Sequence, residues 1–196
     1  MEYTISKTNR NGIILCSFLL ILFILITGLL FLINTPAKID IVERLIRNVI
    51  YLILFGYLML AFFQYFRHYK RTILQGSILI IFIMELIFKS TLFSDIFEST
   101  WKTVGLLSVS SIWIVATIVL IFGLIRNKAE VYPGMHSIRN YAISSFLIYV
   151  FSTTYPFYLK PINPLHTLHL IGLTSAIPFI FTIIFAMKLK LKRKFN

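Results

Sequence analysis

Six apolar runs of about 20 residues each dominate the sequence and restrict the folds that are open to it. They cover residues 13–33, 48–66, 73–93, 104–125, 141–159 and 168–187. A helix of about 20 residues, rising 1.5 Å per residue, crosses a hydrocarbon core about 30 Å thick. The runs lack the two-residue alternation of a β-barrel, and a helix satisfies every backbone group in lipid. We therefore expect an all-α polytopic membrane protein, a six-helix transmembrane bundle in which residues 1–196 form a single domain.

The composition agrees with a chain that is solvated mainly by lipid. Hydrophobic residues make up 58% of the sequence and charged residues 13%, whereas about a quarter of the residues in a soluble domain are charged. The short connections between the runs leave no room for a soluble catalytic domain. The net charge of +12 resides at the ends of the runs rather than on a soluble basic surface, so we expect no nucleic acid partner.

The distribution of Lys and Arg over the connections predicts the orientation in the membrane. With the N-terminus inside, the cytoplasmic segments hold 13 of the 19 cations and the opposite side holds six. By the positive-inside rule, both termini are expected to be cytoplasmic. The abundance of Ile, Phe, Asn and Lys favours an AT-rich genome and hence a bacterial cell membrane. The basic tail, residues 188–194, is expected to contact anionic lipids of the cytoplasmic leaflet.

Glu85 is the one carboxylate well inside an apolar run, about 12 residues into a run of 21. A charge at that depth costs at least about 2.5 kcal/mol and usually has a function. Lys89 lies four residues later on the same face of the expected helix. One interpretation is a local pair in which Lys89 reaches toward the membrane surface. The other is a site that faces the bundle interior and holds a proton or a cation.

The fifth and sixth runs carry hydroxyl groups at helical spacing. Ser145, Tyr149 and Ser152 share one face of the fifth helix. Thr174 and Thr182 share a face of the sixth, on either side of a mid-span proline, Pro178. Such groups often mark helix contacts in membranes, whereas kinked helices near the midplane are frequent in transporter sites. Packing and a polar ligand cavity between the two helices therefore both stay open.

Two other groups of residues are better explained by structural roles than by catalysis or ligand binding. Gly105, Ser108 and Ser111 are small residues spaced three apart, which predicts close packing of the fourth helix at the centre of the bundle. The four histidines lie at the ends of runs, where no two face each other at mid-membrane depth. Two of them without a nearby Asp, Glu or Cys make a poor metal site. We therefore expect no metal and no cofactor.

Residues 113–142 (WIVATIVLIFGLIRNKAEVYPGMHSIRNYA) resemble part of a bacterial family of predicted membrane proteins whose function is unknown. In that family a span ends in a basic, histidine-containing loop that leads into Ile-Arg-Ser/Asn-Tyr-Ala. The family's histidine lies further before the arginine than His136 lies before Arg139, so its role does not carry over. The resemblance covers less than a sixth of the chain and implies a polytopic membrane protein.

The leading hypothesis for function is a small-molecule or ion transport or ligand-binding membrane subunit that is not an enzyme. In this hypothesis the third, fifth and sixth helices surround a polar site. The layout also resembles the substrate-binding subunits of energy-coupling vitamin transporters, without a shared motif. One alternative is a small intramembrane enzyme or redox protein, although no catalytic motif is present. Another is a sensor or immunity protein that acts through a membrane partner, and a homo-oligomer also stays open.

Overall fold

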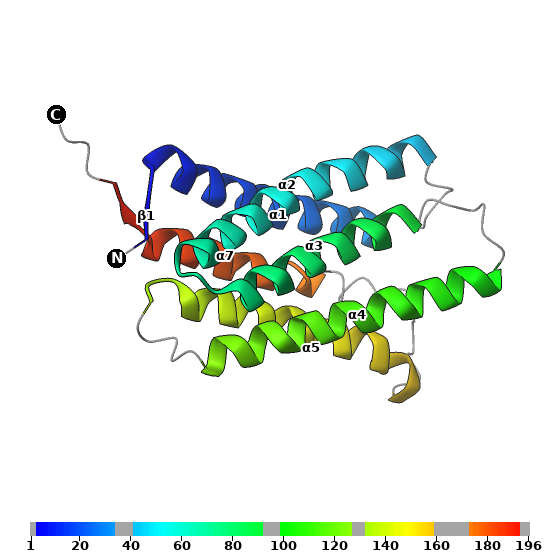
Figure 1. The fold of residues 1–196 in the computed structure, drawn as a ribbon. Helices are drawn as coiled ribbons and strands as arrows, with labels where there is room; N and C mark the ends of the chain where they lie inside the picture. The colour runs from blue at the N-terminus through cyan, green and yellow to red at the C-terminus, as the bar shows by residue number, and fades with distance from the viewer. Residues whose placement is uncertain (1–2, 34–40, 92–98, 127–131, 159–172, 193–196) are drawn as a thin grey trace. The chain divides into compact units, whose positions relative to one another are not determined.

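The computed structural model describes residues 3–33, 41–91, 99–126, 132–158 and 173–192. This part of the chain is all-α, as the sequence predicts, apart from two strands of two residues each. The helices are α1 (Lys7–Ile33), α2 (Ile41–His68), α3 (Thr72–Thr91), α4 (Ser99–Arg126), α5 (Met135–Tyr158) and α7 (Ile177–Lys188), and the strands are β1 (Thr4–Ile5) and β2 (Lys190–Leu191), as labelled in Figure 1. They belong to two compact units: residues 1–38 and 130–196 form unit 1, and residues 39–129 form unit 2.

In unit 1, α7 packs against both α1 and α5. The buried face of α1 consists of Ile13, Ser17 and Leu20, at the spacing of four and three residues that places side chains on one side of a helix. From α7 the unit buries Phe179 and Phe185. Helix packing of this kind buries one apolar stripe per helix and leaves the other faces exposed.

A two-stranded parallel ladder joins the segment before α1 to the segment after α7. Thr4 pairs with Lys190 and Ile5 pairs with Leu191. The backbone N–H of Lys192 also donates to the Ile5 carbonyl over 2.9 Å. These bonds hold the beginning of α1 and the end of α7 at the same end of unit 1, as Figure 1 shows.

In unit 2, α3 packs against α2 on one side and α4 on the other. Two glycines permit close approach. A Cβ on Gly56 of α2 would lie 3.1 Å from the ring of Phe82, and a Cβ on Gly123 of α4 would lie 2.5 Å from Leu74 Cδ2. Phe82 also stacks on Phe55, with 6.3 Å between ring centroids. Glycine and aromatic residues therefore set the spacing of these three helices.

A tight turn joins α2 to α3. The N–H of Arg71 donates to the Phe66 carbonyl over 3.0 Å, and the N–H of Lys70 donates to the Arg67 carbonyl over 3.1 Å. This pair of bonds is the Schellman motif, which needs a left-handed residue after the helix. Lys70 supplies it with a φ of 53°, although glycine usually occupies that position. The turn makes α2 and α3 antiparallel neighbours.

Four helices, α1, α2, α4 and α5, begin at least five residues before the apolar runs that predict them. α1 begins at Lys7 rather than at residue 13 because Ser6 caps it: Ser6 Oγ accepts from the N–H of Asn9 over 3.1 Å. α2 begins at Ile41 rather than at residue 48. The prediction that Pro178 lies mid-span is wrong, since the chain turns at residues 175–176 and α7 begins at Ile177, with the proline in its first turn. Proline is tolerated there because its missing N–H has no partner in any helix.

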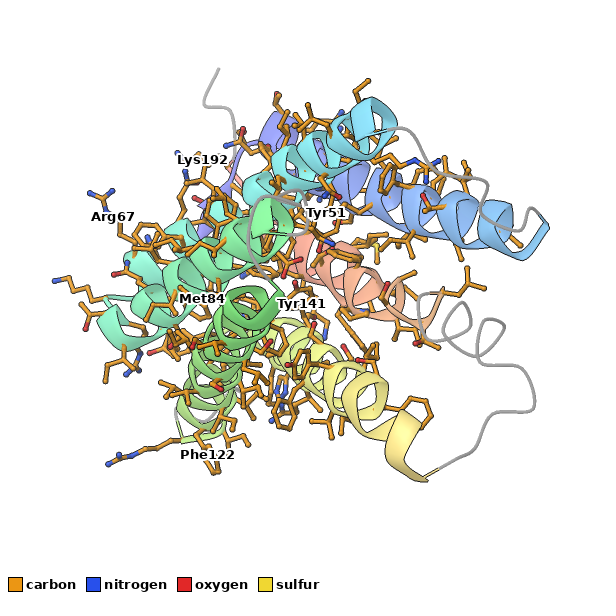
Figure 2. All side chains as sticks on the ribbon, turned by 90° about the vertical axis from the view of Figure 1, so that its right-hand side faces the viewer. Tyr51, Arg67, Met84, Phe122, Tyr141 and Lys192 are labelled. Atoms are coloured by element: carbon orange, nitrogen blue, oxygen red, sulfur yellow. The ribbon has the colours of Figure 1, made fainter. Side chains whose placement is uncertain are left out.

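Three described helices contain a stretch that is long and apolar enough to cross a membrane. These stretches are Lys7–Thr27, Leu45–His68 and Leu107–Arg126. Thr72–Ile87 and Ile177–Lys188 are shorter apolar helices. Many large apolar side chains on these helices are exposed, among them Ile73, at 71%, and Phe122, at 67%. Phe122 is labelled on α4 in Figure 2.

Candidate functional site

Glu85 and Lys89 lie on α3 of unit 2, and both side chains are half-buried. Within the part of the chain that the structure describes, no ion pair joins them. The ammonium of Lys89 instead lies 4.8 Å from the centroid of the Tyr51 ring on α2, and Tyr51 stacks on Phe55 with 5.6 Å between centroids. This arrangement is a cation–π contact, which stabilises a cation at low exposure to water. Lys89 is therefore held toward α2, and the roles of Glu85 and Lys89 remain predictions.

Two serine hydroxyls of α5 bond to their own helix. Ser152 Oγ donates to the Tyr149 carbonyl over 2.8 Å, and Ser144 Oγ donates to the Tyr141 carbonyl over 3.0 Å. Ser145 and Tyr149 are half-buried. Serine hydroxyls that return to the backbone three residues earlier are satisfied without a ligand. The hydroxyl of Ser152 thus has a hydrogen-bond partner within its own helix. The ligand-binding roles of Ser145 and Tyr149 remain predictions.

Thr174 and Thr182 do not share a helical face in the structure. Thr174 is exposed and precedes the turn at residues 175–176, whereas Thr182 is fully buried on α7. The hydroxyl of Thr182 makes a short hydrogen bond with Ser17 of α1. The expected polar pair of the sixth run is therefore divided, and its buried member faces α1.

The contact between Ser17 and Thr182 is the clearest polar link between helices in unit 1. Each hydroxyl also lies 2.7 Å from a carbonyl of its own helix, Ser17 from Ile13 and Thr182 from Phe179. Two hydroxyl groups carry only two hydrogens for these three contacts, so the hydrogens are shared between the helix backbones and the bond across the interface. Sequence reasoning did not identify Ser17, which is a single small polar residue in the apolar run 13–33.

An aromatic contact joins α5 to α7 at Tyr141. Its ring meets that of Phe179 edge to face, with 6.0 Å between centroids, and both residues are buried. Tyr141 is labelled in Figure 2. The face of the fifth run that was expected to be polar thus begins with an apolar packing contact.

The stripe of small residues on α4 is not where that helix packs most closely. A Cβ on Gly105 would meet nothing within 4 Å. Ser108 and Ser111 are exposed, and their hydroxyls donate to the Val104 and Leu107 carbonyls. The expected close packing occurs at Gly123 instead.

Among the residues that the structure describes, no three His, Cys, Asp or Glu side chains are grouped so that they could hold a metal ion. His68 packs its ring edge to face with Tyr69, 5.0 Å away between centroids. His136 is half-buried in the first turn of α5. Both histidines thus lie at helix ends, where sequence reasoning placed them.

Comparison with known proteins finds no protein-family model, no curated protein and no solved structure that matches this chain. The resemblance of residues 113–142 to a family of membrane proteins therefore adds nothing to the geometry described above.

Proposed function

We propose that the chain is a multi-pass protein of a bacterial cell membrane that crosses the bilayer six times, with both termini in the cytoplasm. The three membrane-length stretches and the exposed apolar side chains support a lipid environment. The β1–β2 ladder supports termini that share one side, because it holds the two ends of the chain together. The cations near that ladder support the cytoplasmic side by the positive-inside rule.

Within that framework, the chain is a transport or ligand-binding subunit that takes up a cation at Glu85. One observation carries this assignment: a half-buried carboxylate lies on an apolar helix, and its nearest lysine along the helix contacts an aromatic ring instead. A carboxylate inside a membrane helix that is not paired with the nearest lysine is by default interpreted as a functional site. A monovalent cation or a proton supplies the missing charge.

The test measures cation-dependent stability of the purified protein in nanodiscs. Thermal unfolding is followed in NaCl, KCl and choline chloride at equal ionic strength, between pH 5 and 9. A cation that binds only the folded state raises its apparent stability. We expect Na⁺ or K⁺ to raise the midpoint of the wild type, and Glu85→Gln to abolish this rise while keeping the fold. Lys89→Met should leave the rise in place.

Glu43→Gln is the matched control and should leave the cation effect unchanged, because Glu43 lies in the first turn of α2, before the apolar stretch Leu45–His68. Identical profiles for the wild type and for Glu85→Gln would remove Glu85 as a binding site. A cation effect lost in Glu43→Gln as well would show that general surface charge, rather than a site, causes it.

A further inference from the structure

One end of unit 1 gathers three parts of the chain that lie far apart in the sequence. The first turn of α1 is there because β1 pairs with β2, and β2 directly follows α7. The beginning of α5 is there because Gly134 packs against Phe185 and Leu189, so closely that a Cβ on it would lie 2.8 Å from the Phe185 ring. Figure 1 shows the starts of α1 and α5 and the end of α7 at this same end. We call it the basic end.

Every cation among the described residues of unit 1 lies at the basic end. They are Lys7 and Arg10 in the first turn of α1, Arg139 in the second turn of α5, and Lys188, Lys190 and Lys192 at the end of α7 and after it. His136 is a further titratable group there. The described residues of unit 1 include no Asp or Glu. Six like charges gathered at one end repel one another, and this repulsion favours the binding of an anion there.

Two polar atoms at the basic end are buried without a hydrogen-bond partner. They are Nε of Arg10 and Oγ of Ser137, and Ser137 as a whole is only 2% exposed. A buried donor without an acceptor costs about 1–3 kcal/mol. A guanidinium has donors only, so the missing partner of Arg10 is an acceptor, and an anionic oxygen suits it best.

We propose that the basic end binds phosphate, either as the headgroup of an anionic lipid or as the free ion. Arg10 donates from its guanidinium, Arg139 and the lysines after α7 supply further positive charge, and the Ser137 hydroxyl completes the set of donors. Guanidinium groups match the geometry of phosphate oxygens, whereas lysines act as point charges. The lipid form of the proposal rests on the proposed membrane orientation, because it needs the basic end to lie at the bilayer surface.

The experiment uses the full chain in a neutral detergent, with three probes: phosphatidylglycerol, phosphatidylcholine and inorganic phosphate. Thermal shift gives the affinity, and native mass spectrometry counts the molecules retained. We expect phosphatidylglycerol or inorganic phosphate to stabilise the wild type and phosphatidylcholine to do so less. Arg10→Gln should weaken binding about tenfold, as for one charge-assisted hydrogen bond, and Arg10→Lys should recover only part of it.

Arg126→Gln is the matched control, since Arg126 is an exposed cation at the end of α4 in unit 2 and should bind the probes as the wild type does. Ser137→Ala should weaken binding without loss of fold. Stabilisation by phosphatidylglycerol but not by inorganic phosphate assigns the site to a lipid, and the reverse assigns it to the free ion.

The proposal is overturned if neither anion stabilises the wild type, or if Arg10→Gln and Arg126→Gln weaken binding equally. Glu85→Gln separates this proposal from the proposed function, because it should abolish the cation effect and leave phosphate binding unchanged.

Discussion

Unit 1 and unit 2 each contain three described helices, but different contacts hold them together. In unit 1, α7 joins α1 through the buried hydroxyls of Ser17 and Thr182, and the β1–β2 ladder ties the chain segments on either side. In unit 2, apolar side chains pack on glycines, Phe82 on Gly56 and Leu74 on Gly123, and Lys89 lies over the Tyr51 ring. The charges differ as well, since the described part of unit 1 has no carboxylate, whereas unit 2 carries Glu85 inside α3.

This difference shows that apolar composition does not determine how a helix is recognised by its neighbour. Hydrophobic burial provides little drive between helices in lipid, because lipid tails are as apolar as leucine. Each unit must therefore be held together by other kinds of contact. Unit 1 uses hydrogen bonds that cross between chain segments, together with the close packing of the turn residue Gly134 on Phe185. Unit 2 uses close packing of side chains on two glycines within its helices. A substitution that removes one of these contacts should lower the stability of its own unit and leave that of the other unit unchanged.

The largest effect is expected for Gly134→Ala in unit 1. Gly134 has a φ of +89°, which costs an L-residue roughly 1–2 kcal/mol. The added Cβ would also lie 2.8 Å from the Phe185 ring, and such overpacking costs about 1–3 kcal/mol more. Thermal unfolding in detergent should show the sum of the two. Adding Phe185→Leu should restore only the steric part, and a stability equal to that of the wild type would contradict the strain at this position.

A smaller loss, about 1–3 kcal/mol, is expected for Gly123→Ala in unit 2. The new Cβ would lie 2.5 Å from Leu74 Cδ2, and the Leu74 side chain is itself 2% exposed, so it has little room to shift. Gly105→Ala is the matched control on the same helix, because nothing lies within 4 Å of its added Cβ. It should be neutral or stabilise by up to about 1 kcal/mol. Equal effects at both glycines would show that close packing of α3 and α4 is not what Gly123 provides.

The smallest effect is expected for the hydroxyl pair of unit 1. Ser17→Ala and Thr182→Val each remove one side of the bond between α1 and α7. A double-mutant cycle should give a coupling free energy of about 0.6 kcal/mol and at most about 1.7 kcal/mol, the range measured for polar contacts between membrane helices. Ser144→Ala is the control, since that hydroxyl bonds to its own helix. A coupling of zero would leave unit 1 without its proposed polar link.

The sequence predicts the helices better than it predicts their partners. Apolar runs of membrane length identify the six described helices, because a run of apolar residues is a local signal. Gly105 and Gly123 are indistinguishable by such reasoning, and only the position of α3 makes the second one a contact. Pro178 was placed mid-span because the turn at residues 175–176 has no strong sequence signal.

The same limit applies to the candidate sites. Thr182 was identified by its spacing, yet its partner Ser17 is 165 residues away in sequence, beyond the reach of any local pattern. Lys7 and Arg10 were interpreted as signals of orientation, and the basic tail as such a signal and as a contact for anionic lipids. Their grouping depends on the β1–β2 ladder, which involves only two residues per strand, and Arg139 joins them through the packing of Gly134 on Phe185. Glu85 was found from sequence alone, because one carboxylate in an apolar run is conspicuous without knowledge of its neighbours.

The pairing of β1 with β2 also has a consequence for biosynthesis. α1 leaves the ribosome first of the described helices and α7 last, so the core of unit 1 cannot close until the chain between them has been made. Unit 2 is continuous over residues 39–129, and all of it is synthesised during that interval. Domains commonly fold in the order of their synthesis. Unit 2 is thus expected to assemble while α1 is in the bilayer or the insertion machinery without its partner helix α7. The last step of folding is then the docking of α7 onto α1.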